Sequence, residues 1–120
     1  MMRFVSGLIG FTAALLSGSL ATAQDDPARN YPSKSIKLVV AYAVGGGTDI
    51  MARLAAKELT ASLGQTVFVE NRPGTLAIAG TEYAAKAPPD GYTLLATPSG
   101  PMTMNPIVRA QLPYSPLGDF

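Results

Sequence analysis

The stretch that decides the fold of this chain is IKLVVAYAVGGGTDIMARLAAKELTASL, from Ile36 to Leu63. Its apolar, β-branched start predicts a strand from Ile36 to about Tyr42 that is covered on both faces. Three glycines follow, and an apolar stripe through Met51, Leu54, Ala55, Leu59 and Leu63 then predicts a helix over Asp49–Leu63. Gly64 is expected to end this helix. The stretch therefore indicates a strand, a glycine turn and a helix.

The glycine turn has the chemistry of an anion site. Glycines let the backbone approach a ligand closely, and the free N–H groups and dipole of a helix start favour negative charge. Thr48 or Asp49 is expected to cap the helix. We predict a cradle for a carboxylate or phosphate over Val44–Asp49, with a tight turn that binds nothing as the alternative.

The first 23 residues have the pattern of a cleaved export signal. Arg3 precedes an apolar core from Phe4 to Leu16, and Ala21-Thr22-Ala23 places cleavage before Gln24. The alternative, a membrane anchor, needs about 20 unbroken apolar residues. The chain has no cysteine, and export without disulfides suits a bacterial periplasm. We therefore predict a periplasmic protein whose residues 24–35 are a lead-in.

Composition excludes several functions. Removing Arg3 from nine basic residues leaves eight, against eight acidic ones, so the mature chain is neutral. A neutral chain lacks the basic face that binding to nucleic acid or a membrane surface requires. With no histidine and no cysteine, the chain offers no catalytic triad, thiol chemistry or histidine metal site. We predict no catalytic residue, no metal and no cofactor, and hence no enzyme.

The rest of the chain alternates strands and helices. The pattern predicts strands at 66–70 and 92–96, a helix from 77 or 78 to 86, and a short helix around 105–111. This order predicts an α/β fold with a β-α-β-α-β parallel sheet. Ligands of such sheets lie beyond the carboxyl ends of the strands. The polar or glycine-bearing loops there, which should converge on one site, are Val44–Asp49, Asn71–Thr75 and Thr97–Thr103.

Single residues allow both functional and structural interpretations. The glycines fit neither nucleotide motif, because no Gly-Lys-Ser/Thr follows them and Ile50 stands where the dinucleotide fingerprint needs a glycine. Asp49 could be a general base, although such a carboxylate is more often a cap. Arg72 could equally bind an anion or form a structural pair. Ser99 lacks the Gly-x-Ser-x-Gly context of a nucleophile.

Five motifs together resemble the periplasmic solute-binding receptors of tripartite tricarboxylate transporters, the Bug family. In chain order they are Tyr31-Pro32-x-Lys34-x-Ile36, Gly45-Gly46-Gly47-Thr48-Asp49, Val69-Glu70-Asn71-Arg72-Pro73-Gly74, Pro89-Asp90-Gly91-Tyr92-Thr93-Leu94 and Leu112-Pro113-Tyr114. The resemblance implies a monomeric, two-lobed Venus-flytrap receptor that closes on a small carboxylic acid and passes it to a membrane permease. It implies a ligand site made of Tyr42, Ala43, Gly45, Gly46, Gly47, Thr48, Asp49, Thr97, Ser99 and Gly100.

The chain departs from the family pattern in three ways. Where the family usually has Gly-Ala-Gly-Gly-Asn-Ile-Gly, this chain has Gly74-Thr75-Leu76-Ala77-Ile78-Ala79-Gly80, so Ile78 replaces a polar asparagine and should alter ligand choice. The first loop, 41–44, lacks the family's prolines. Such receptors have roughly 300 residues, twice the usual domain scale, so we expect residues 36–120 to form a partial first lobe. We expect this lobe to be marginally stable and to bind ligand poorly by itself.

Two other functions remain open on the sequence. A small exported interaction module could use an unpaired sheet edge to bind a partner without any small-molecule ligand. An α/β enzyme would need catalytic residues from outside this chain.

Overall fold

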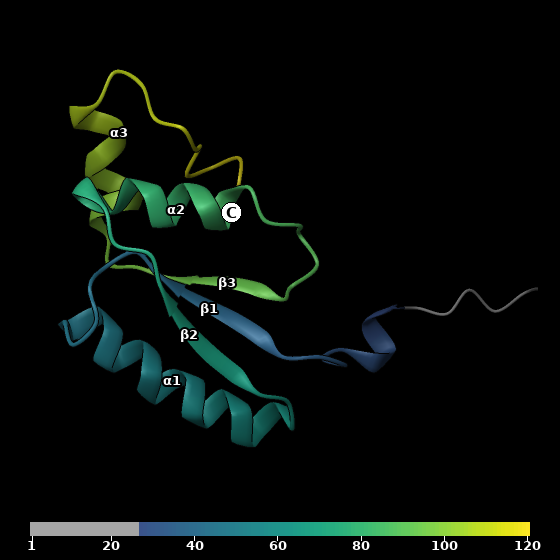
Figure 1. Cartoon of the computed structure of the whole chain (residues 1–120). Coiled ribbons are helices and arrows are strands. Elements are labelled where there is room, and N and C mark those ends of the chain that lie inside the picture. The colour runs from purple at the N-terminus through teal and green to yellow at the C-terminus, as the bar shows by residue number, and fades with distance from the viewer. Residues whose placement is uncertain (1–26) are drawn as a thin grey trace, which may run out of the picture.

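The computed structural model describes residues 27–120, and the predicted export signal over residues 1–23 lies outside them. A three-stranded sheet forms the middle layer, with α1 on one face and α2 on the other (Figure 1). The helices and strands are β1 (Ile36–Val40), α1 (Gly47–Leu63), β2 (Val67–Asn71), α2 (Ile78–Ala85), β3 (Thr93–Ala96) and α3 (Asn105–Val108). Three short helical turns complete the described chain: η1 (Pro27–Asn30), η2 (Thr75–Ala77) and η3 (Gly100–Met104).

The sheet confirms the predicted β-α-β-α-β order. β1 lies in the centre and pairs in parallel with β2 and with β3. Leu38 is in register with Val69 on one side and with Leu94 on the other. The predicted ends were less accurate: β1 stops at Val40, α1 starts before Asp49, and α3 is shorter than expected. In the described chain, no helix has the length and apolarity needed to cross a membrane.

The core lies between β1 and α1. Alternate β1 residues pack on this face with Val67 and with two small α1 residues, Ala52 and Ala56. Because these helix residues are alanines, α1 can approach the sheet closely. The predicted apolar stripe of α1 is partly wrong: Met51 and Leu54 are 64% and 55% exposed. Met51 is open because α1 lies over β2 and β1 rather than β3, which leaves the side of the helix nearest β3 uncovered. Leu54 is two residues from each of the buried Ala52 and Ala56, so it lies on the opposite face of the helix, away from the sheet.

The end of α1 is fixed as the sequence predicts. Gly64 has a left-handed φ of 68°, and its N–H donates to the carbonyl of Thr60 at 3.1 Å. The hydroxyl of Thr60 in turn accepts the N–H of Val67 at 2.9 Å. The cap therefore joins α1 directly to the start of β2.

On the other face, α2 approaches the end of β1 so closely that only glycine fits at position 80. A Cβ on Gly80 would lie 2.6 Å from the Cβ of Ala41 and 2.6 Å from the carbonyl oxygen of Arg72. One of these contacts is with backbone, which cannot rotate away. Gly80 therefore sets the distance between α2 and the exits of β1 and β2.

We predict that Gly80→Ala lowers the free energy of unfolding by about 1–3 kcal/mol, the usual cost of overpacking. The matched control is Gly100→Ala, because a Cβ on Gly100 meets nothing within 4 Å. Urea titration followed by circular dichroism measures both changes. Equal stability of the two variants would contradict the close contact.

Candidate ligand-binding site at the strand exits

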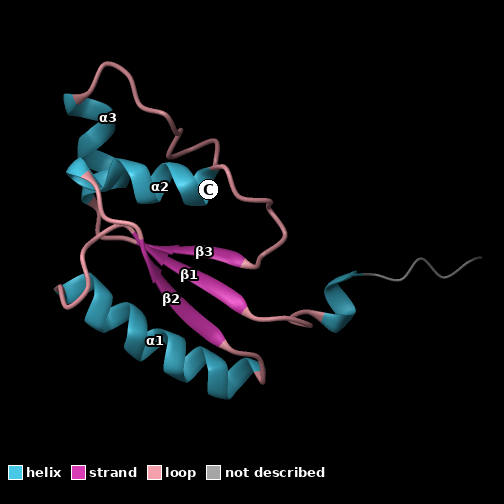
Figure 2. Cartoon of the chain, in the orientation of Figure 1, coloured by secondary structure: helices cyan, strands magenta, loops and turns pink. Residues whose placement is uncertain are grey.

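The three strand exits meet at one end of the sheet, as the sequence predicts (Figure 2). A side-chain hydrogen bond of 2.9 Å joins Asn71, at the end of β2, to Asp49 at the start of α1. A second one of 2.9 Å joins Asn105 of α3 to the carbonyl of Leu76 in η2. A groove lined by Thr48 and Thr97, among others, brings the first loop beside the third.

The glycine turn places open backbone N–H groups at this end. Gly45 has φ 84°, which favours glycine, and Gly46 is the extended residue before α1. The prediction that Thr48 or Asp49 caps the helix is wrong, because Gly46 takes the cap position and no side chain caps there. The first-turn N–H groups of α1 have no carbonyl within the helix to which they can donate, because no helical turn comes before them. They include the N–H groups of exposed Gly47 and half-buried Thr48.

Asp49 lies beneath this turn rather than on its surface. Its residue is 2% exposed, and one carboxylate oxygen accepts the Gly45 N–H at 2.9 Å and the Arg53 Nε–H at 3.0 Å. The other oxygen accepts the Asn71 Nδ2–H at 2.9 Å. These bonds, with that from Arg53 contributing most, lower the pKa of Asp49 from 3.8 to about 2. Such a buried, fully bonded carboxylate fits a structural role better than that of a general base.

Asn71 and Arg53 complete this network, and the sequence reasoning missed both as site residues. Asn71 also donates to the carbonyl of Tyr42 at 3.1 Å, and its own side-chain oxygen accepts from Arg53 Nη2 at 3.0 Å. The spacing of Asp49 and Arg53, four residues apart on a helix, was the available sequence signal. The sequence placed Asn71 only as the first residue of the second strand-exit loop.

The other predicted site residues lie at different depths. Tyr42 is half-buried against the core, where burial, with a smaller contribution from Tyr114, raises its pKa. Ala43 is exposed beside the glycines. Ser99 is exposed just before η3, and Gly100 is the first residue of that turn. Thr97, by contrast, borders the groove.

This groove is the hollow that the first and third loops share. Its volume is about 620 Å³, and its end at the strand exits is lined by Gly47, Thr48, Thr97 and Pro98. Apolar residues of α1 and β3 line the rest, including Met51 and Leu95. The structure therefore brings two residues of the predicted first-loop site together with one of the third loop. The groove is not lined by Tyr42, Ala43, Ser99 or Gly100.

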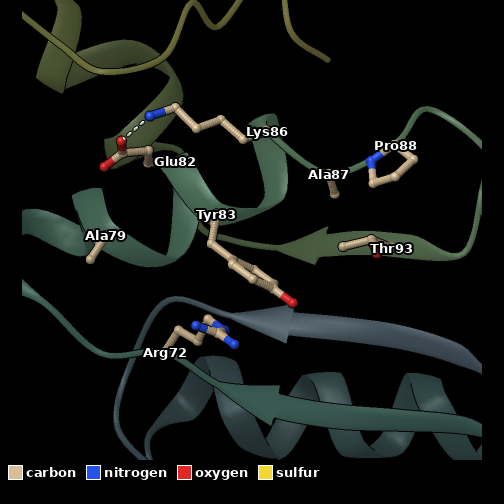
Figure 3. A pocket seen from close by; sticks show the side chains of 8 residues that line it. All are labelled: Arg72, Ala79, Glu82, Tyr83, Lys86, Ala87, Pro88 and Thr93. Carbon is tan, nitrogen blue, oxygen red and sulfur yellow. Dashed lines mark hydrogen bonds and ion pairs between the residues drawn. The ribbon is translucent and has the colours of Figure 1, made fainter.

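Of the two roles predicted for Arg72, anion binding and a structural pair, the structure shows the structural pair. Its guanidinium lies 3.5 Å from the ring centre of Tyr83 and pairs with Glu70, which also binds Lys37 at 2.7 Å. Figure 3 shows Arg72 beneath the Tyr83 ring in a cavity of about 570 Å³ on the α2 face. Lys86, at the far side of that cavity, pairs with Glu82. Each charged side chain that Figure 3 draws in this cavity therefore already has a partner of opposite charge in the same chain.

The second loop contains two strained residues. Leu76 and Ala77 have φ of 54° and 59°, a left-handed conformation that side chains with a Cβ rarely adopt. The loop is held there by the Ala77 N–H, which donates to Gly74 at 3.0 Å, and by the bond from Asn105 to the Leu76 carbonyl. Ile78 follows as the half-buried first residue of α2.

Comparison with known proteins agrees with this geometry. A profile of the family described as "Tripartite tricarboxylate transporter family receptor" matches residues 51–120. Protein BugT of Bordetella pertussis is 42% identical over 94 residues, which are 78% of this chain and 29% of that protein. Among solved structures, one described as a periplasmic transporter is 46% identical with a TM-score of 0.69, over 72% of this chain and 29% of its own.

Two further solved structures have ligands in their descriptions. MatC from Rhodopseudomonas palustris with bound malate is 34% identical, with a TM-score of 0.71, over 75% of this chain and 31% of its own. Rpa4515 of R. palustris with adipate is 36% identical, with a TM-score of 0.69, over 72% of this chain and 29% of its own.

The parallel sheet and these neighbours define a solute-binding protein with a flytrap-like fold, of which the described residues are consistent with a partial first lobe. The family match and the identities then make the assignment specific: the chain belongs to the tripartite tricarboxylate transporter receptor family. It is a family of transporter receptors rather than of enzymes, and it includes periplasmic binding proteins. The chain spans 29% of the length of BugT.

We predict that acid destabilises the protein partly through Asp49. Because the folded pKa lies below the ordinary 3.8, the ionised carboxylate stabilises the fold above that value. This contribution is lost as the pH falls from 3.8 toward about 2. Urea titrations at successive pH values should show a shallower slope in this window for Asp49→Asn than for the wild type. Parallel profiles would contradict the assignment.

We also predict that Leu76→Gly raises the free energy of unfolding by about 1 kcal/mol, because it relieves a left-handed backbone. Leu76 suits the test because its side chain is 49% exposed, so little packing is lost. The control, Ala79→Gly, places a glycine three residues away within α2 and should lower stability by about 1 kcal/mol. Thermal unfolding should move in opposite directions for the two variants. Destabilisation by both would show that Leu76 is not strained.

Proposed function

We propose that this chain is part of a periplasmic receptor that captures a small carboxylic acid for a tripartite tricarboxylate-type transporter. In this proposal it acts by binding and not by catalysis, and the membrane permease of the transporter is its protein partner. The observation that carries the proposal is that relatives with the same fold hold dicarboxylates, malate in MatC and adipate in Rpa4515.

The electrostatics of the first loop support an anionic ligand. The N-terminus of α1 carries partial positive charge on its unpaired N–H groups. Asp49 would oppose this charge, but Arg53 pairs with it at 3.0 Å and compensates it. The first-turn N–H groups therefore keep their preference for a carboxylate. Gly47 and Thr48 line the groove together with Thr97. The Thr97 hydroxyl donates to the Pro98 carbonyl at 3.2 Å, and it would have to turn from that carbonyl to donate to a ligand.

We assign the predicted residues to this site in two groups. Gly47, Thr48 and Thr97 are proposed to contact the acid directly, because they line the groove at its strand-exit end. The remaining predicted residues are proposed to shape or border the site: Tyr42, Ala43, Gly45, Gly46, Asp49, Ser99 and Gly100. The contacts that a second lobe would make are outside this chain, so we expect weak binding here.

The test is titration of the full chain with malate and with adipate, followed by amide NMR. We expect saturable shifts of the Gly47, Thr48 and Thr97 amides and none at Gly64 or Gly91, which lie away from the strand exits. The neutral diamide of each acid is the ligand control, because it keeps the shape and removes the charge.

A pair of variants locates the binding. Thr48→Val removes a groove hydroxyl and should weaken the response to both acids, whereas Thr66→Val, an exposed change at the opposite end of β2, should not. Shifts of equal size with the diamides, or shifts centred away from the groove, would contradict capture of a carboxylate at the strand exits.

A further inference from the structure

Hydrogen-bond donors from three separate segments converge on the buried carboxylate of Asp49. They are the Gly45 N–H of the first loop, Arg53 of α1 and Asn71 at the start of the second loop, at 2.9–3.0 Å. We propose that Asp49 is a positioning residue, which locks the first two strand-exit loops into one unit without touching the ligand. The inference rests on the proposed function, since these loops are the ones proposed to form the ligand site.

The side chain at position 49 must accept three hydrogen bonds and donate none. The side-chain oxygen of Asn71 is already used by Arg53 at 3.0 Å, and its nitrogen also serves the carbonyl of Tyr42 at 3.1 Å. Asn71 can therefore offer only N–H groups to position 49. Gly45 and Arg53 also offer only donors there, and an ionised carboxylate is the side chain that accepts all three bonds.

An amide at position 49 cannot replace this carboxylate in any orientation. With its oxygen toward Gly45 and Arg53, its nitrogen faces the nitrogen of Asn71. If Asn71 then turns over, its nitrogen faces Arg53 and its oxygen faces the Tyr42 carbonyl. Every arrangement sets a donor against a donor, so Asp49→Asn must separate the two loops.

The burial of Asp49 explains why its role is indirect. The residue is 2% exposed, and its oxygens face the chain's own donors rather than the groove. Arg53 is the charged group that faces it, and the remaining partners are neutral. What the ligand would meet is the backbone of the glycine turn, which Asp49 holds from below through the Gly45 N–H.

The experiment compares three forms of the full chain with the wild type. Asp49→Asn breaks the network. Glu58→Gln makes the same chemical change at an exposed position of α1 and controls for charge and helix effects. The double variant Asp49→Asn, Asn71→Asp moves the carboxylate across the loop interface. The position-71 carboxylate can then accept from Arg53 and from the position-49 amide, whose oxygen serves Gly45. The Tyr42 carbonyl loses its donor and faces a carboxylate oxygen, so recovery should be partial.

Hydrogen exchange of the Gly45 amide measures the lock without any ligand. We expect exchange at least about tenfold faster in Asp49→Asn, because a neutral amide oxygen then replaces the charged acceptor of the Gly45 N–H. Glu58→Gln should leave it unchanged, and the double variant should recover part of the protection. Titration with malate and adipate should show weaker binding in Asp49→Asn with the same amides responding, and partial recovery in the double variant.

The outcomes separate this proposal from the proposed function. Unchanged Gly45 exchange in Asp49→Asn, or no recovery in the double variant, overturns the positioning role. If Asp49→Asn does not fold, the double variant decides: restored folding supports the exchange of partners, and continued unfolding overturns it. A wild type that ignores both acids removes the proposed function, while the exchange data still decide whether Asp49 locks the loops.

Discussion

The arrangement of the strand exits depends on one buried charge. Asp49 is the only carboxylate that the described core encloses, and it receives hydrogen bonds from the glycine turn, from its own helix and from the end of β2. An unpaired buried carboxylate would be strongly destabilising, so the sequence must supply a matching donor at each of these places. The fold of the first two loops is thus fixed by the need to satisfy one ion.

The same arrangement reconciles two demands on the start of α1. A helix N-terminus stabilises a negative charge, and Asp49 already supplies one from within the first turn. Because the carboxylate points back to Gly45 and is paired with Arg53, it occupies the buried side of the turn. The exposed side keeps its free N–H groups. A charge that could have competed with a ligand instead stabilises the backbone that would hold it.

The sequence predicted what depends on local pattern. The β-branched run of β1, the left-handed Gly64 and the alanine-rich α2 before two prolines each have a cause within a few residues, and each appears as predicted. The exposed face of α1 was not predictable in this way. Whether Met51 or Ala52 faces the sheet depends on which strands the helix crosses, and both belong to one broad apolar surface. Asn71 joined the site through pairing of β1 with β2, a contact between residues far apart in sequence.

In the second loop, the backbone adopts a conformation that its local sequence does not favour. Leu76 and Ala77 have no preference for a left-handed backbone, yet both adopt it. The usual family pattern, Gly-Ala-Gly-Gly-Asn-Ile-Gly, has glycine at both positions, where this conformation costs little. Here the contacts around the loop must hold it: Asn105 binds the Leu76 carbonyl, Ala77 is fully packed, and Thr81 binds the Ala77 carbonyl at 2.8 Å. The third exit therefore supports the second through Asn105, as Asp49 of the first supports it through Asn71. Because these two asparagines join the three loops, the geometry of the site depends on all three together.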